Sequence, residues 1–216
     1  MIPLTGDRWT ISTSTDDNVD FTVWALQDDG LRAGAFDAHP NGNGRLRLAG
    51  LIEQRWHAWF RRVVRTASER ADAVGGDPAV IPQRYPEAQR AQTAASMFNE
   101  SEATRDLLLK IWPEYLRRSR ERVDRAFAKY AERRNEVTDE QEEVLAGQAR
   151  QFWEDLQDYR PLPPLHVYLV EYVKPVVAVV RPASIVIGLT DPQEDDLERY
   201  GSLVFEGASL LKSTVG

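Results

Sequence analysis

The sequence predicts an α+β fold with a mostly antiparallel sheet, formed from strands at the N- and C-terminal ends of the chain. Residues 7–37 and 166–189 are rich in valine, isoleucine, threonine and aromatic residues, which favour strands. Between them, apolar residues recur every three or four positions, which is typical of amphipathic helices. Terminal strands that pair with one another would leave a long central helical region packed on one side of the sheet.

The N-terminal strands are predicted from three runs of residues. Trp9–Thr15 is rich in β-branched side chains, and Asp20–Leu26 alternates loosely between apolar and polar ones. Asp28–Gly30 has the composition of a hairpin turn that leads into Leu31–Phe36. We therefore expect short strands, joined by a hairpin, before the first helix.

A long helix is expected over about Leu46–Ala73, where one face collects the apolar side chains. These are Leu48, Ile52, Trp56, Trp59, Phe60, Val63 and Ala67. Gly75–Pro78 should end the helix, and residues 74–86 contain three prolines, so they are expected to form a loop. Pro86 suits the first position of a short helix that would reach about Phe98.

The central segment Glu102–Asp158 predicts an antiparallel helical hairpin whose two arms carry opposite charges. Arg117–Arg134 holds eight basic and three acidic side chains, whereas Glu136–Asp158 holds eight acidic side chains and one base. Both arms have helical apolar spacing and a short connection, so they can pack side by side. Pro113 removes a helical hydrogen bond, so a kink or a fresh helix start is expected there. The carboxylates of the second arm would neutralise the arginines of the first.

The C-terminal part is expected to return to strands. The strand runs, which are dominated by valine, isoleucine and tyrosine, are His166–Val173, Val176–Val180 and Ser184–Leu189. Asp191–Glu194 matches the start of a short helix that should end near Gly201. Leu203–Leu211 fits either a strand or a helix.

The length of 216 residues fits one large α+β domain over residues 1–216. Pro161–Pro164 forms a stiff boundary, so the alternative is a division at that point. Residues 1–160 would then hold the N-terminal strands and the helices, and residues 161–216 would form a strand-rich part. A chain of this length can bury enough surface to fold without a metal or a disulfide.

Composition narrows the classes of function. A net charge of −7 disfavours non-specific binding to phosphate backbones or anionic lipids. The absence of cysteine excludes disulfides, thiolate catalysis, iron–sulfur clusters and zinc fingers. The first residues lack the order of a secretory signal, and no apolar run approaches the roughly 20 residues needed to cross a bilayer. We expect a cytoplasmic protein without membrane association, metal or cofactor, and 23 arginines against 4 lysines suggest a GC-rich bacterial gene.

Arginine-rich helices provide the first candidate site. Guanidinium groups form forked pairs with phosphate oxygens, so these helices could follow a nucleic-acid backbone. The candidate residues are Arg55, Arg61, Arg62, Arg65, Arg117, Arg118, Arg120, Arg122 and Arg125. The alternative, which the negative net charge favours, is that they form solvated helix faces, partly paired with the carboxylates that follow.

A glycine-rich turn provides the second candidate, an anion site formed by Gly42, Gly44 and Arg45. A strand, such a turn and a helix start can together present backbone N–H groups to an anion. The segment lacks a complete phosphate-binding motif, so a plain connection is the alternative. Asp37 and His39 alone do not make a metal site.

Glu171 provides the third candidate. Strand alternation places its side chain on the same face as Val167 and Leu169. Burial among aliphatic side chains would raise its pKa and suit a general acid or base. The alternative is a carboxylate paired with Arg181 or Lys174, or an edge position open to water.

Catalytic signatures such as G-x-S-x-G and H-E-x-x-H do not occur in the sequence. The leading hypothesis is therefore a non-catalytic intracellular protein that acts in protein–protein interaction or in the assembly of a bacterial complex, with another protein or with itself. The helical hairpin, the valine-rich strand region or both would carry the contact. Nucleic-acid association through the arginine-rich helices is the first alternative. A carboxylate-dependent enzyme that uses Glu171 is the second.

Overall fold

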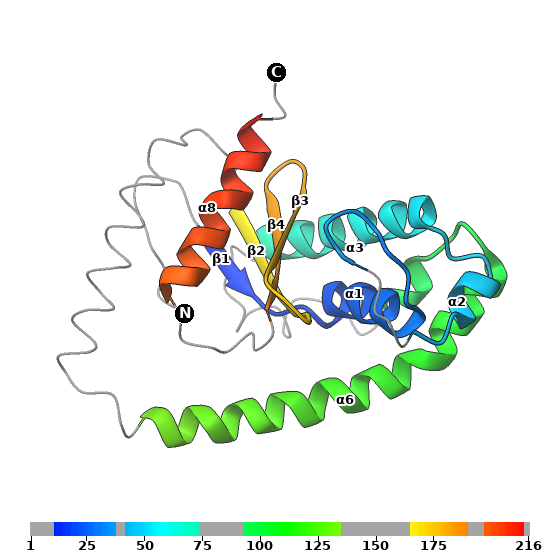
Figure 1. Cartoon of the computed structure of the whole chain (residues 1–216), viewed down its shortest axis with the longest axis horizontal. Helices are drawn as coiled ribbons and strands as arrows, with labels where there is room; N and C mark the ends of the chain where they lie inside the picture. The colour runs from blue at the N-terminus through cyan, green and yellow to red at the C-terminus, as the bar shows by residue number, and fades with distance from the viewer. Residues whose placement is uncertain (1–10, 38–41, 74–92, 135–164, 190–196, 214–216) are drawn as a thin grey trace.

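The computed structural model of the chain describes residues 11–37, 42–73, 93–134, 165–189 and 197–213. Within these residues, four strands form one mixed sheet between α8 on one side and α1 and α3 on the other (Figure 1). In chain order, the elements are β1 (Ile11–Ser14), α1 (Asp17–Asp29), α2 (Arg45–Leu48), α3 (Glu53–Ala73), η1 (Ala95–Met97), α6 (Glu102–Arg134), β2 (Leu165–Glu171), β3 (Val176–Val180), β4 (Ser184–Leu189) and α8 (Leu197–Ser213).

The sheet has the strand order β1-β2-β4-β3. β1 and β4 both run parallel to β2, and β3 runs antiparallel to its neighbour β4. The prediction of a mostly antiparallel sheet is therefore wrong. Parallel neighbours need a long crossover connection, and the helices between β1 and β2 supply it. The N-terminal and C-terminal parts of the chain thus meet in this sheet, with Ser14 beside Tyr168.

The strands predicted at Asp20–Leu26 and Leu31–Phe36 are wrong, because the first lies in α1 and the second forms a tight turn. Asp16 caps α1, since its Oδ1 accepts hydrogen bonds from the N–H groups two and three residues ahead, at 2.8 and 3.1 Å. Gly30 ends the helix in the left-handed conformation, with φ of 69°. These caps and the buried apolar face outweigh the strand preference of the β-branched residues.

The long helix predicted over Leu46–Ala73 is interrupted. α2 ends at Leu48 and α3 begins at Glu53, and Gly50 between them has φ of 106°, a conformation that favours glycine. Leu48 and Ile52 consequently leave the apolar face, and their exposed fractions are 90% and 48%. The other residues of the predicted face are buried in α3, namely Trp56, Trp59, Phe60, Val63 and Ala67.

α6 runs continuously from Glu102 to Arg134 and passes through Pro113. The second arm of the predicted hairpin, Glu136–Asp158, lies outside the described residues, and so does the segment that includes Pro86. The neutralisation of one charged arm by the other therefore stays a prediction.

The three predicted C-terminal strands are confirmed as β2, β3 and β4. The predicted helix end near Gly201 is wrong, because α8 continues through this residue to Ser213. Leu203–Leu211 is therefore helical, and its apolar side chains Val204, Ala208 and Leu211 are buried against the sheet.

The sheet separates two hydrophobic clusters. One is rich in aromatic residues and joins α1, α3 and α6 to the sheet, and the other is aliphatic and joins α8 to it. β2 contributes to both clusters, since Val167 belongs to the aliphatic one and Tyr168 to the aromatic one. The expectation that all helices lie on one side of the sheet is therefore wrong. Among the described helices, none combines the length and the apolar character that a membrane span requires.

Candidate functional site

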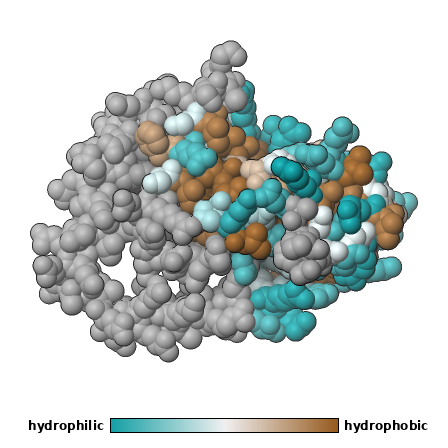
Figure 2. Space-filling model, in the orientation of Figure 1, coloured by the Kyte–Doolittle hydropathy of each residue, from teal (hydrophilic) through white to brown (hydrophobic). Residues whose placement is uncertain are grey.

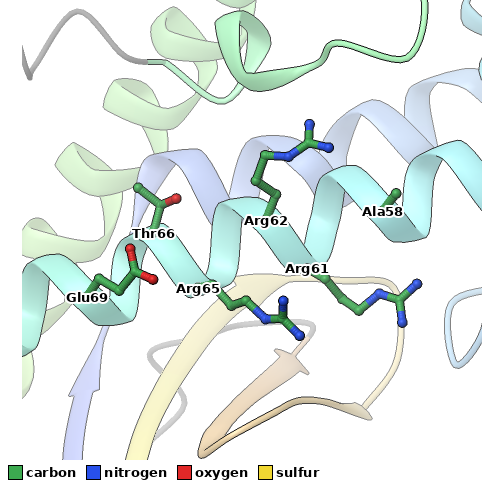
Figure 3. A pocket seen from close by; sticks show the side chains of 6 residues that line it. All are labelled: Ala58, Arg61, Arg62, Arg65, Thr66 and Glu69. Atoms are coloured by element: carbon green, nitrogen blue, oxygen red, sulfur yellow. The ribbon is translucent and has the colours of Figure 1, made fainter.

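The arginine-rich face of α3 forms a shallow cavity of about 430 Å³. Its lining residues are Ala58, Arg61, Arg62, Arg65, Thr66 and Glu69. Figure 3 shows that Arg61 and Arg65 point to the same side of α3, over the strands, whereas Arg62 points to the opposite side. The three guanidinium groups therefore do not converge on one point.

The four arginines of α3 that were predicted to bind nucleic acid fall into two groups. Arg62 donates to the carbonyl of Met97 at 2.6 Å and to Oε1 of Glu100 at 2.7 Å, so it anchors the η1 segment. Arg55 donates to the carbonyl of Gly50 at 2.8 Å and holds the turn before α3. These two arginines already have structural partners.

Arg61 and Arg65 are exposed, and each donates to a backbone carbonyl, that of His57 at 3.2 Å and that of Arg181 at 3.3 Å. The nucleic-acid alternative on α3 therefore stays a prediction that concerns two residues rather than four.

The arginines of α6 form local ion pairs where their side chains are described. Arg117 lies 3.3 Å from Glu121, and Arg118 lies 3.2 Å from Glu114, both one turn apart on the exposed helix surface. Such exposed pairs contribute little to stability. The side chains of the other predicted α6 residues, Arg120, Arg122 and Arg125, lie outside the described part.

Glu171 is the last residue of β2 and is exposed, so it is not buried among aliphatic side chains. It lines a cavity of about 290 Å³ between α1, α6 and the end of β2. The lining residues are Asp20, Trp24, Gln27, Tyr115, Arg118, Ser119, Glu121 and Glu171. This cavity lies beyond the carboxyl ends of the parallel strands, which is the usual place for a ligand in such sheets.

Asp20 is the central polar residue of this cavity, and sequence reasoning missed it. It is 4% exposed, and its carboxylate accepts hydrogen bonds from the Tyr115 hydroxyl at 2.9 Å and from the Glu171 N–H at 3.0 Å. Ser119 donates to Asp17 at 2.9 Å beside it. These bonds join α1, α6 and β2, so the carboxylates have a structural role. The sequence signal that could have identified Asp20 is its place between two apolar residues, at positions 19 and 21, which are buried.

The Asp20 cavity has two further properties that bear on chemistry. The side-chain nitrogen of Gln27 is buried and has no hydrogen-bond partner in the described part of the chain. Within that part, no group of three or more His, Asp or Glu residues is placed to hold a metal ion. The enzyme alternative based on Glu171 therefore stays a prediction, with Asp20 and Tyr115 lining the same cavity.

A second buried polar cluster joins α3 to the sheet. The Ser68 hydroxyl lies 3.0 Å from the Tyr168 hydroxyl and 2.8 Å from the Ser184 hydroxyl. Burial raises the pKa of Tyr168 well above its ordinary value, so this phenol stays protonated. Nearby, His166 Nε2 lies 3.0 Å from Asp72 Oδ1. The cluster fixes α3 on β2 and β4.

The glycine-rich turn leads into α2, and an internal carboxylate occupies the start of that helix. Asp29 accepts hydrogen bonds from the N–H groups of Leu46 at 2.6 Å and Arg47 at 3.0 Å. Its burial raises the pKa of this carboxyl above the ordinary value of 3.8. Arg45 lies 3.5 Å from Asp28. An external anion at Gly42–Arg45 would have to compete with these groups, and the anion-site hypothesis stays a prediction.

β3 is an edge strand of the sheet and belongs to the valine-rich region that the sequence offered as a contact surface. Its residues Val176–Val180 are all apolar, and three of them, Val176, Ala178 and Val179, are half-buried. Within the described part of the chain, β4 is the only hydrogen-bonding partner of its backbone. We call this strand border the β3 edge. The valine run was visible in the sequence, but its edge position was not.

Exposed apolar side chains occur near the β3 edge. Val173 is 58% exposed, and Phe205 and Leu210 of α8 are each 40% exposed. Figure 2 shows hydrophobic residues gathered on the surface in the region of α8 and β3. Apolar patches of this kind commonly mark contact surfaces.

Comparison of the chain with protein-family models, with curated proteins and with solved structures finds no match. The functional conclusion therefore depends on the geometry of the molecule.

Proposed function

We propose that this protein is a non-catalytic interaction or assembly component of an intracellular bacterial complex, and that the β3 edge carries the contact. The observation behind the proposal is a completely apolar edge strand with unpaired outward backbone groups within the described residues. A partner strand could pair with these groups and extend the sheet.

The composition of the β3 edge supports this proposal. Edge strands are usually protected by lysine, an inward charge, a bulge or a proline within the strand. Val176–Val180 contains none of these residues, and its pairing with β4 is regular over all five positions. Pro175 and Pro182 lie beyond the two ends of the strand. The β3 edge is therefore short, but none of these protective features interrupts it.

The hydrogen-bonding pattern of the β3 backbone determines how a partner strand could pair with it. In an antiparallel pair, hydrogen-bonded and non-hydrogen-bonded residues alternate along each strand. Every second residue of β3 thus directs its N–H and C=O away from β4. A partner strand would satisfy these groups and cover the half-buried side chains of Val176, Ala178 and Val179.

The proposal is tested with a charge placed on the β3 edge. Val179→Lys introduces a cation at a half-buried position of the β3 edge, and Leu109→Lys is the control because it changes an exposed apolar residue of α6. Hydrodynamic mass and co-purification from native host cells are measured for the wild type and both variants.

The proposal predicts that the wild-type chain has a mass above 24.6 kDa or retains a stoichiometric partner. Val179→Lys should weaken this association by at least about tenfold, and Leu109→Lys should preserve it. A wild-type chain that stays at 24.6 kDa at all concentrations, without a stoichiometric partner, would overturn the proposal.

A further inference from the structure

We infer that the β3 edge binds the β3 edge of a second copy of this chain, as an antiparallel pair with a twofold axis through Ala178. This inference depends on the proposed function and names its partner. It follows from the strand sequence, from the position of β3 in the sheet and from the residues at its two ends.

The sequence of β3 is the same in both directions. Val176-Val177-Ala178-Val179-Val180 is a palindrome, and antiparallel pairing reverses one strand relative to the other. A twofold axis at Ala178 therefore places Val177 opposite Val179 of the partner subunit, and Val176 opposite Val180 of the partner subunit. Each pair joins two β-branched side chains, which pack well across neighbouring strands.

Ala178 suits the position on the twofold axis. At this position, each side chain meets its own copy directly, and opposite residues of antiparallel strands come within about 4.5–5.5 Å. Alanine is the smallest side chain in the strand, so self-contact at this position is free of crowding. A strand with its bulkiest residue at the centre would not offer this fit.

The residues that flank β3 are compatible with the same register. If the register continues, Lys174 lies opposite Pro182 of the partner subunit, and Arg181 lies opposite Pro175 of the partner subunit. Like charges therefore do not meet across the pair. The ammonium group of Lys174 is also paired with the carboxylate of Asp37. Proline lacks an N–H group, so the two prolines limit the new ladder to the five residues of β3.

A second copy also closes the assembly. An isologous contact of β3 with β3 uses the same surface on both subunits and ends at a dimer. A contact of β3 with the other edge strand, β1, would be heterologous and would leave an open edge at each end of the assembly. The twofold axis lies perpendicular to the joined sheet, so both α8 helices lie on one face, beside the seam.

Cysteine cross-linking tests the register because the natural chain has no cysteine. Ala178→Cys places two thiols opposite each other on the axis, within the Cα distance that a disulfide spans. Val176→Cys is the matched control on the same strand. Its two copies would lie four residues apart along the strand direction, about 13 Å, which is beyond disulfide reach.

The inference predicts that oxidised Ala178→Cys forms a covalent dimer and that Val176→Cys does not. It also predicts a wild-type mass of twice 24.6 kDa, which Val179→Lys reduces to 24.6 kDa. The wild-type mass and the Val179→Lys comparison keep the inference testable even if Ala178→Cys fails to fold, which a thermal unfolding curve would reveal.

Three results would overturn the inference, and they separate it from the proposed function. A monomeric chain whose other protein partner is lost in Val179→Lys would support the β3 edge as a contact but exclude a second copy. A dimer that survives Val179→Lys and does not cross-link through Ala178→Cys would place self-association on another surface. A monomer without any partner would overturn both proposals.

Discussion

The two faces of the sheet are held by different kinds of contact. In the aromatic cluster of α1, α3 and α6, buried rings also use their polar atoms. Trp56 Nε1 donates to the carbonyl of Thr22 at 2.9 Å, and Trp59 Nε1 donates to the carbonyl of Ala94 at 2.7 Å. These directional hydrogen bonds, together with burial, fix the position of each ring.

The cluster under α8 contains only aliphatic side chains within the described residues, such as Ile185, Val204 and Leu211. The contacts in this cluster depend on how well the shapes of its side chains fit together. Gly207 allows α8 to approach Ile185 closely. The β3 edge lies beside this cluster, and α8 packs on β3. The comparison teaches that the aromatic side is fixed by directional hydrogen bonds as well as by burial, whereas the aliphatic side depends on the packing of apolar side chains alone.

The largest expected effect concerns the aromatic cluster. Trp59→Ala removes a fully buried ring and its hydrogen bond, and we expect the free energy of unfolding to fall by about 3–5 kcal/mol. Leu109→Ala, at a 43% exposed position of α6, is the control and should change it by less than about 0.5 kcal/mol. Chemical denaturation measures both. Similar losses in the two variants would contradict the role given to the buried ring of Trp59.

The second prediction concerns the carboxylate that directs α2 onto the aromatic side. Asp29→Ala leaves the N–H groups of Leu46 and Arg47 without their acceptor, and should lower the free energy of unfolding by about 1–3 kcal/mol. Asp28→Ala, at the neighbouring half-buried position, should have a smaller effect. Equal effects in chemical denaturation would contradict the role given to Asp29.

The pH dependence of Asp29 follows from the direction of its pKa shift. Burial raises the folded pKa above 3.8, so the stability linked to this group is fully present below the unfolded pKa and is lost as pH rises through the folded pKa. The difference in unfolding free energy between the wild type and Asp29→Asn should therefore decrease as pH rises from below 3.8 through the folded pKa. An increase over this interval would contradict the shift.

The third prediction tests the shape-dependent packing of the aliphatic cluster. A Cβ at Gly207 would lie 2.7 Å from Cδ1 of Ile185, so Gly207→Ala should lower the free energy of unfolding by about 0.5–2 kcal/mol, although alanine favours the helix. Combined with Ile185→Val, the loss should be smaller than the sum of the two single changes. Additive losses in thermal or chemical unfolding would argue against direct contact.

The smallest expected effect concerns the turn between β2 and β3. The hydrogen bond from Lys174 lowers the pKa of Asp37 below 3.8, so the stability linked to Asp37 is present above the unfolded pKa and is lost as pH falls through the folded pKa. In Lys174→Ala, the titration midpoint of Asp37, measured by NMR, should rise toward 3.8. Arg32→Ala should raise it less, because Arg32 is the weaker influence.

Strands with strong local preference were predictable from the sequence. Val176–Val180 and Ser184–Leu189 appear where valine and isoleucine concentrate, because both faces of these strands are covered. The direction of pairing was not predictable, because side-chain composition does not distinguish parallel from antiparallel neighbours. The pair of Ile11 with Leu165 joins positions far apart in the chain, and such contacts leave no local signal.

The N-terminal helix and the candidate sites show a second limit. Asp16 and Gly30 carried the signals of a helix start and end, but the β-branched residues between them suggested strands. For Arg62 and Arg55, charge was visible in the sequence, whereas their bonds to Glu100 and Gly50 depend on tertiary contacts. Whether an arginine or a carboxylate is available to a ligand depends on its partners in the folded protein, and the sequence does not show these partners.

Sedimentation equilibrium of the wild type and Val179→Lys, over a range of concentrations, tests the central claim most directly. If the β3 edge joins two copies, the wild type has twice the chain mass of 24.6 kDa and Val179→Lys has the chain mass itself. A folded wild type that remains at 24.6 kDa throughout, or a Val179→Lys variant that keeps the doubled mass, would contradict it.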